Sequence, residues 1–260
     1  MLDLPELKIE DQEADARFRR LAVQGGLNPD DPWVGGYVDY EWTHARYIFE
    51  PLIPRGPRVL EFGCNVGATS VVLARLGADV TGVDVNPLCV ELARANAGRY
   101  GVRADFLHLE DTRRMPFETA SFDLVSSNSV LEYVPRHMLG EVQREIDRVL
   151  KPEGLVVVTG TSSRLWPKEV HSRRWSNWIP RSWAPSLQRG ISPWQVRSGF
   201  GRYEDLGVSD RGRWLIEAKR QMGFPVWSCR LMRLAGTALA PLGVSAGMLT
   251  PSIALLLRKK

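Results

Sequence analysis

Short apolar runs and longer amphipathic stretches alternate through residues 58–160 and mark the regular elements of the chain. Glycine, proline, asparagine or aspartate separates many of them, as expected of turns between elements. The alternation is typical of β-α-β units and predicts a mainly parallel sheet covered by helices. Helices are expected at residues 67–76, 87–99 and 138–150, and strands at residues 58–62, 79–85, 104–109, 121–125, 155–159, 225–232 and 253–257.

The apolar end of the chain does not have the pattern of a membrane anchor. Glycines and prolines interrupt residues 231–257 at Gly236, Pro241, Gly243, Gly247 and Pro251. A membrane-spanning helix needs about 20 consecutive apolar residues. We therefore expect this segment to be buried core.

Composition narrows the class of protein only in part. A chain of 260 residues with 44% apolar content suits one α/β domain with an embellishment. The net charge of +4 permits a nucleic-acid partner without indicating one. Three widely spaced cysteines argue against a disulfide framework and against a zinc or other metal site. The acidic start of the chain lacks the features of a signal peptide, so we expect a cytoplasmic protein.

The segment from Val59 to Ser70 is the clearest candidate for a ligand site. It is an apolar strand, a glycine-containing turn and a helix start, and the backbone N–H groups of a helix start can bind a ligand. A G-x-G-x-x-G dinucleotide site counted from Gly63 would need glycines where Asn65 and Ala68 stand. Glu61 would also repel a pyrophosphate. A cationic ligand without phosphate suits this turn better.

The same segment resembles motif I of the class I S-adenosylmethionine-dependent methyltransferases (the type 11-like group). Glu61, Gly63 and Gly67 match that motif, and Asn65 replaces its middle glycine. Asparagine tolerates left-handed backbone angles better than most residues. Later stretches resemble further motifs of the family in the expected order, and residues 148–154 depart from theirs only at Glu153. The resemblance covers residues 58–160 and implies S-adenosylmethionine as the cofactor.

Two aspartates have specific expected roles in that cofactor site. Asp84 ends the second strand, where a carboxylate can accept from both ribose hydroxyls. Capping of the next helix is the alternative, although Asn86 is available for that. The resemblance places Asp111 opposite the adenine amino group, with a solvated turn as the alternative. The expected cofactor-binding set is Glu61, Gly63, Cys64, Asn65, Gly67, Asp84, Val85, Asp111, Thr112 and Asn128. Tyr133 is a further candidate, facing the sulfonium through its ring.

The resemblance implies a Rossmann-like, doubly wound sheet of seven strands, mostly parallel with an antiparallel last strand. We expect residues 1–50 to be a helical lead-in that includes a candidate cofactor lid around Tyr37, Tyr40, His44 and Arg46. Aromatic packing on the sheet is the alternative for most of these side chains. Residues 51–260 are expected to form the methyltransferase domain, in which residues 160–220 are a helical, Trp- and Arg-rich insertion on the acceptor side.

That insertion contains 12 Arg or Lys residues against five acids, and six of the nine tryptophans. Such a composition suits an acidic or phosphorylated small molecule, RNA or an anionic membrane surface. A packed cap with solvated arginines is an equally good interpretation. The oligomeric state is left open.

Methyl transfer to a hydroxyl needs a general base. His171 is the first candidate because it follows the fifth strand, and His44 and His137 are weaker ones. We expect methyl transfer to an oxygen or nitrogen of a small molecule, lipid or saccharide precursor. The alternatives are a non-catalytic cofactor-binding or scaffold subunit, an RNA methyltransferase and, less favoured, an NAD-dependent oxidoreductase.

Overall fold

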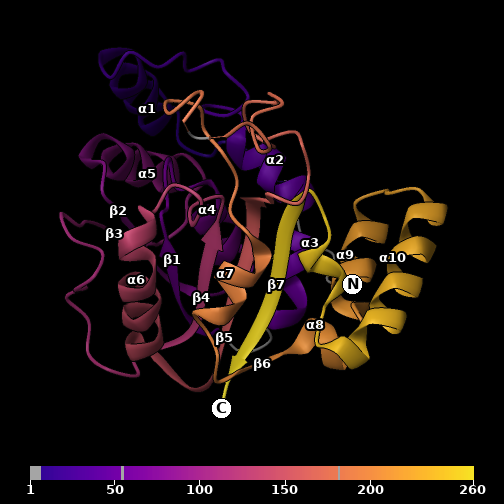
Figure 1. The fold of residues 1–260 in the computed structure, drawn as a ribbon. Coiled ribbons are helices and arrows are strands. Elements are labelled where there is room, and N and C mark those ends of the chain that lie inside the picture. The colour runs from indigo at the N-terminus through magenta and orange to yellow at the C-terminus, as the bar shows by residue number, and fades with distance from the viewer. Residues whose placement is uncertain (1–6, 54–55, 181) are drawn as a thin grey trace. The chain divides into compact units, whose positions relative to one another are not determined.

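The computed structural model describes residues 7–53, 56–180 and 182–260. These residues form two compact units, the first ending at Asp111 and the second beginning at Thr112. The start of the chain on which the cytoplasmic expectation depends lies outside these residues. The seven strands follow the order β3-β2-β1-β4-β5-β7-β6. Three of them belong to the first unit and four to the second (Figure 1).

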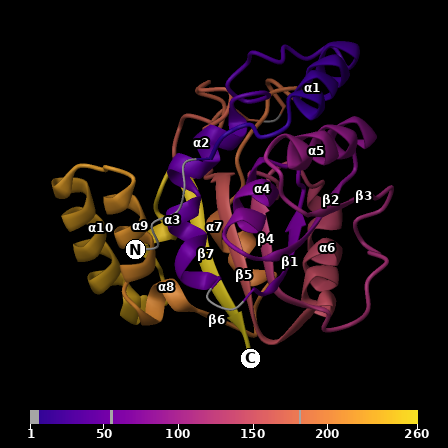
Figure 2. The same cartoon turned by 180° about the vertical axis from the view of Figure 1, so that it is seen from behind.

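The first unit is a three-stranded parallel sheet with helices before and between the strands. Its elements are α1 (Gln12–Gln24), α2 (Tyr37–His44), α3 (Arg46–Phe49), η1 (Glu50–Leu52), β1 (Arg58–Phe62), α4 (Ala68–Arg75), β2 (Asp79–Asp84), α5 (Pro87–Arg99) and β3 (Asp105–His108). β2 pairs in parallel with both β1 and β3. Helix α1 packs along α5, where Phe18 and Leu92 are fully buried (Figures 1 and 2).

The second unit contains the remaining strands and the antiparallel end of the chain. Its elements are β4 (Phe122–Asn128), α6 (Arg136–Val149), β5 (Leu150–Ser162), α7 (Pro193–Ser198), β6 (Tyr203–Asp205), α8 (Leu206–Ser209), α9 (Arg213–Gln221), α10 (Val226–Leu239), η2 (Ala240–Leu242), η3 (Ala246–Met248) and β7 (Ser252–Lys259). β5 pairs in parallel with β4 and antiparallel with β7, which pairs antiparallel with β6. The predicted mostly parallel sheet with an antiparallel last strand is therefore confirmed.

The strand predicted at residues 225–232 is wrong, because that segment begins helix α10. Pro225 has a φ of −56° and stands immediately before the helix, and the buried positions Cys229 and Gly236 then follow at helical spacing. The sixth strand is instead the short Tyr203–Asp205 segment, whose first and last residues are buried.

The buried-core interpretation of residues 231–257 holds only for their second half. The residues of η3 and most of β7 are buried, whereas Leu231, Leu234 and Leu242 are 59%, 68% and 74% exposed. No helix among residues 7–53, 56–180 and 182–260 is long and apolar enough to cross a membrane.

The Trp- and Arg-rich insertion after β5 contains less helix than predicted. The described residues from 163 to 192 form turns and one isolated bridge, and helix begins only at α7. Hydrogen bonds to a buried side chain replace regular structure here. Asn177 is fully buried and donates to the carbonyls of Ser163, Trp166 and Lys168 at 2.9–3.1 Å.

Candidate functional site

The turn after β1 has the backbone conformation that its sequence predicts. Gly63, Asn65 and Gly67 all lie in the left-handed region, with φ values of 79°, 49° and 77°. Asparagine is one of the few residues other than glycine that adopt the left-handed backbone conformation at a modest cost in free energy. Its presence in place of the motif's middle glycine is compatible with the turn.

Gly67 is required for packing as well as for its backbone angle. A Cβ atom there would lie 2.8 Å from the Cβ and 2.9 Å from the Cα of Ala93, on helix α5. Real Cβ atoms do not approach so closely. Helix α4 therefore begins at a point where only glycine fits.

Asp84 connects the turn to the end of β2. Its Oδ2 accepts from the backbone N–H of Asn65 at 2.8 Å, and its Oδ1 accepts from that of Asn86 at 2.9 Å. Asn86 caps α5 through a separate bond from the Leu88 N–H. Each carboxylate oxygen retains acceptor capacity, and Asp84 is only partly buried. These properties fit the ribose-binding role.

Val85, immediately after Asp84, offers apolar surface at the same strand end. Val85 is 58% exposed, and its backbone carbonyl oxygen lies 3.1 Å from Nε2 of His108. An exposed valine beside a carboxylate suits the face of an adenine ring. Asp111, the last residue of the first unit, is partly buried.

Glu61 is buried among polar groups instead of facing solvent. Only 2% of the residue is exposed, and its carboxylate accepts from the Ser70 hydroxyl. Burial, with a smaller contribution from the charge of Glu41, raises the pKa of Glu61 to about 8, against the hydrogen bonds from Ser70 and Thr69 that lower it. Near neutral pH this carboxyl is therefore mostly protonated.

Cys64 contributes only its backbone to the turn. The residue is 2% exposed and packs with Val90, Ala93 and Phe106 in the core of the first unit. Its N–H, like that of Gly63, donates to the Val83 carbonyl. All three cysteines are free in the described chain.

In the second unit, His171 is held by a buried carboxylate. Nε2 of His171 lies 2.9 Å from Oε1 of Glu132, whose side chain is fully buried while that of His171 is 31% exposed. The same Oε1 accepts from the Ser162 N–H at 2.9 Å. Glu132 Oε2 is buried and has no hydrogen-bond partner among the described residues. The histidine is thus fixed on one side and partly open to solvent.

Electrostatics around His171 favour its charged form. The hydrogen bond from His171 to Glu132 raises the pKa of the imidazole, and the charges of Glu132 and Glu169 and the Gly160 carbonyl act in the same direction, against desolvation. Glu169 is buried and accepts from the backbone N–H groups of His171 and Ser172 at 3.1 and 2.6 Å. Burial alone would raise the pKa of Glu169, but these bonds lower it below the ordinary value.

The other predicted residues of the second unit lie near the ends of β4 and β5. Asn128 Oδ1 accepts from the Thr159 hydroxyl at 3.3 Å, and a Cβ at Gly160 would approach that oxygen within 2.3 Å. Tyr133 is 54% exposed, and its ring lies 6.1 Å from that of His171. Thr112 opens this unit and is partly buried.

The weaker histidines have ordinary structural surroundings. His44 stacks on Tyr40 at 4.2 Å in α2, and its Nδ1 lies 2.7 Å from the Tyr40 carbonyl. His137 is an exposed residue of α6. Within residues 7–53, 56–180 and 182–260, no cluster of three or more His, Cys, Asp or Glu side chains is placed to hold a metal ion.

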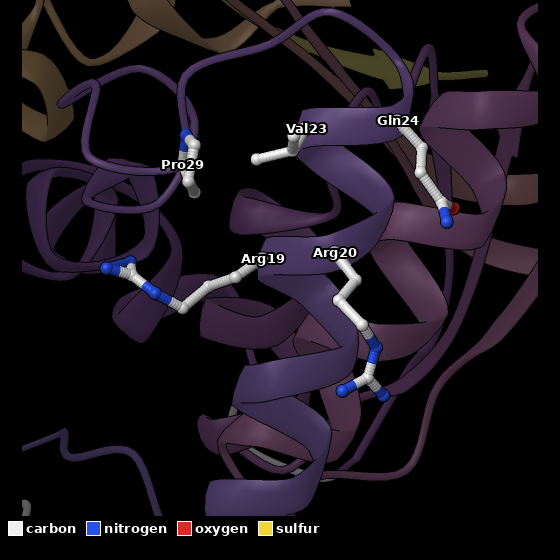
Figure 3. A pocket seen from close by; sticks show the side chains of 5 residues that line it. All are labelled: Arg19, Arg20, Val23, Gln24 and Pro29. Carbon is white, nitrogen blue, oxygen red and sulfur yellow. The ribbon is translucent and has the colours of Figure 1, made fainter.

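A hollow on the surface of α1 is separate from these residues. It is lined by Arg19, Arg20, Val23, Gln24 and Pro29. The guanidinium groups of Arg19 and Arg20 point apart (Figure 3), and that of Arg19 pairs with Asp30 at 2.7–2.9 Å. The hollow lacks converging polar groups, so it is a weaker candidate than the strand ends.

The sequence alone predicted no role for Glu132, Glu41, Ser70 or Glu169. Glu132 lies in the loop after β4, a position where ligand-binding residues are common. Its partner lies 39 residues away, beyond α6 and β5, and no local pattern predicts such a contact. The same holds for Glu41, which raises the pKa of Glu61 from a separate helix.

Comparison with known proteins identifies the central part of the chain. Residues 60–158 match the family model described as a methyltransferase domain. The ubiquinone biosynthesis O-methyltransferase of Xanthomonas axonopodis pv. citri is 38% identical over 113 residues, which are 43% of this chain and 46% of that protein. That of Maricaulis maris is 29% identical over 59% of this chain and 63% of the relative. The chain thus spans less than two thirds of the length of these relatives.

A solved structure extends the likeness in fold to nearly the whole chain. The crystal structure of the [4+2]-cyclase SpnF is similar with a TM-score of 0.53 and 22% identity, over 95% of this chain and 94% of that one. At this identity the likeness concerns the fold alone. It confirms the predicted Rossmann-like fold.

Residues 60–158 are a methyltransferase domain, and the predicted resemblance to the class I S-adenosylmethionine-dependent family is confirmed. The cofactor of that family is S-adenosylmethionine. Asp84, Val85 and the left-handed turn at Asn65 fit its adenosine part, since they offer acceptors and apolar surface. The individual site residues stay predictions.

Proposed function

We propose that the chain transfers a methyl group from S-adenosylmethionine to a hydroxyl oxygen of a small molecule, with His171 as the general base. The proposed acceptor is a small molecule, a lipid precursor or a saccharide precursor, and we place the enzyme in the cytoplasm. The observation that carries the base assignment is the hydrogen bond between His171 and the buried Glu132.

A hydroxyl needs such a base because it must lose its proton while its oxygen attacks the methyl carbon. Bound S-adenosylmethionine would supply the methyl group from its positively charged sulfur and would leave as a neutral thioether. His171 takes the proton on the ring nitrogen that does not face Glu132. Glu132 orients the ring and stabilises the imidazolium, as carboxylates do in other histidine pairs.

The names of the relatives support oxygen as the acceptor atom. Two relatives from different bacteria are both called ubiquinone biosynthesis O-methyltransferases. The similarity covers only part of each relative, 46% and 63% of their lengths. An oxygen acceptor is therefore part of the proposal for this chain.

The test measures release of S-adenosylhomocysteine with a panel of catechols that bear alkyl chains of increasing length. Replacing His171 by alanine should lower kcat by about 10²–10⁴-fold, the usual contribution of a general base. Glu132→Gln should lower the pKa that limits kcat/KM, since the bond that raises the pKa of His171 is weakened. If His171 had only a structural role, the two substitutions would lower the stability of the protein and leave the pH profile of kcat/KM unchanged. An amine acceptor would leave kcat nearly unaffected by His171→Ala.

Calorimetric titration with S-adenosylmethionine, with NAD as the control, shows whether the protein binds the cofactor. It therefore separates a wrong choice of acceptor from a wrong cofactor assignment. Binding without turnover of any acceptor would favour the scaffold alternative. Absence of binding would refute the proposal at its first step, and binding of NAD instead would favour an oxidoreductase.

An RNA acceptor is the second candidate because of the exposed tryptophans after β5. Trp175, Trp178 and Trp183 are 64%, 65% and 80% exposed, and the Lys168 ammonium lies 5.4 Å from the centre of the Trp175 ring. Bases stack on such side chains. This candidate predicts RNA binding that weakens steeply with salt, whereas a small-molecule enzyme predicts none.

A further inference from the structure

Helix α10 has an apolar stripe that faces solvent. Trp227, Leu231 and Leu234 are 70%, 59% and 68% exposed, and Ala238 continues the stripe as an exposed residue. The spacing of four, three and four residues places these positions on one side of the helix. Soluble proteins expose single apolar residues freely, but contiguous apolar patches mark interaction sites.

The side of α10 opposite the stripe is buried, so the stripe must face solvent. Cys229 and Gly236 are buried, and α10 packs on α9 (Figures 1 and 2). It also contacts η3. A Cβ at Gly236 would lie 2.8 Å from the Arg211 carbonyl oxygen, so the helix is seated closely on its neighbours. The stripe therefore cannot be turned inward by a simple rotation of the helix.

The charges around the stripe identify its partner. Arg230 and Arg233 are exposed, and Arg230 precedes Leu231 and lies one turn from Trp227. Within Val226–Leu239 these two arginines are the charged residues of α10, and the helix contains no Asp or Glu. A helix with Trp and Leu on one face and arginines beside it is typical of helices that lie in the interface of an anionic bilayer.

We propose that α10 docks this protein onto the surface of an anionic lipid bilayer. Trp227, Leu231 and Leu234 enter the boundary between head groups and acyl chains, while Arg230 and Arg233 pair with lipid phosphates. The helix lies in the plane of the membrane and does not cross it. This surface is independent of the proposed methyl transfer, because it needs neither cofactor nor acceptor.

The experiment is flotation of the full chain with vesicles in the absence of S-adenosylmethionine. Vesicles of phosphatidylcholine with one third phosphatidylglycerol should carry the protein at low salt, and pure phosphatidylcholine should carry at least about tenfold less. Binding should fall as salt rises, because the arginine–phosphate attraction is screened.

Variants of exposed residues test the surface without disturbing the core. Leu231→Ser/Leu234→Ser and Arg230→Gln/Arg233→Gln should each weaken vesicle binding about tenfold or more. The matched controls are Val23→Ser on α1, where valine is 63% exposed, and Arg103→Gln, another exposed arginine. Both controls should bind as the wild type does, and circular dichroism should show every variant folded.

Three outcomes would overturn the proposal. The first is a lack of binding to anionic vesicles at low salt. The second is binding that the α10 variants and the controls change equally. The third is a dimer in light scattering that becomes a monomer on Leu231→Ser/Leu234→Ser, because a second copy would then occupy the stripe.

Discussion

At the scale of single residues, Asp84 is the strongest test of the cofactor site. Its partly exposed carboxylate has capacity for the two ribose hydroxyls. Asp84→Ala should weaken S-adenosylmethionine binding about a hundredfold or more, since each bond to a charged group contributes about 1.5–3 kcal/mol. Asp79→Ala, at the other end of β2, is the control because its ion pair with Arg58 is exposed and long at 3.7 Å. Equal affinity of both variants, as measured by calorimetry, would remove Asp84 from the site.

Glu61 predicts a proton release when the cofactor binds. Its pKa of about 8 means that it is mostly protonated at pH 7 in the free protein. A nearby positive charge favours the ionised form and lowers the pKa. If the cofactor's cationic part lies near Glu61, binding at pH 7 should release up to about one proton.

Calorimetry in buffers with different ionisation enthalpies measures this release directly. Glu61→Gln should abolish it, while Glu118→Gln, at an exposed site, should not change it. A proton count of zero for the wild type would show that Glu61 does not sense the cofactor's charge.

At the scale of elements, Gly67→Ala should lower the free energy of unfolding for two separate reasons. Alanine there must adopt a φ near 77° and also meet Ala93 at 2.8 Å. The left-handed conformation costs about 1–2 kcal/mol, and overpacking costs a further ~1–3 kcal/mol. Gly77→Ala, at φ +96° with no atom within 4 Å, should pay only the first part. Urea denaturation of both variants separates the two, and equal losses would contradict the close packing.

The irregular segment after β5 depends on one buried amide. Besides its three donor bonds, Asn177 accepts from the Gly190 N–H at 2.7 Å. Asn177→Ala removes three donor bonds to carbonyls of the segment and the partner of the buried Gly190 N–H, and the loss of that partner alone costs about 1–3 kcal/mol. We expect faster proteolytic cleavage between residues 163 and 192 with the sheet intact. Unchanged cleavage would mean that the exposed tryptophans, and not this amide, hold the segment.

Local patterns predicted the elements where one rule was sufficient. The turn at Gly63, the Asn86 cap and the helix Pro87–Arg99 follow from glycine, cap and proline signals. The pattern failed at Pro225, where a short apolar run with two arginines suits both a strand and an amphipathic helix. The Glu132–His171 contact was beyond prediction because it joins two loops through tertiary structure alone.

At the scale of the whole molecule, opposite pKa shifts predict how stability depends on pH. The bond to Arg148 lowers the pKa of Glu145, so its contribution is present above the ordinary value of 4.5 and is lost as pH falls through the lowered pKa. The raised pKa values of Glu61 and His171 act in the other direction. Their contributions are present below the ordinary values and are lost as pH rises through the raised ones.

The free energy of unfolding should therefore be highest in mildly acidic solution and decline between about pH 5 and pH 9. Glu61 dominates this decline because its charge must be created inside the core. Each pKa unit corresponds to about 1.4 kcal/mol, so the loss should be on the order of a few kcal/mol. Glu61→Gln should flatten the alkaline side of the profile and leave the acid side, to which Glu145 and Glu169 both contribute, unchanged. Urea denaturation at pH 5.5, 7 and 9 checks this, and parallel profiles for wild type and Glu61→Gln would show that the carboxyl ionises without cost.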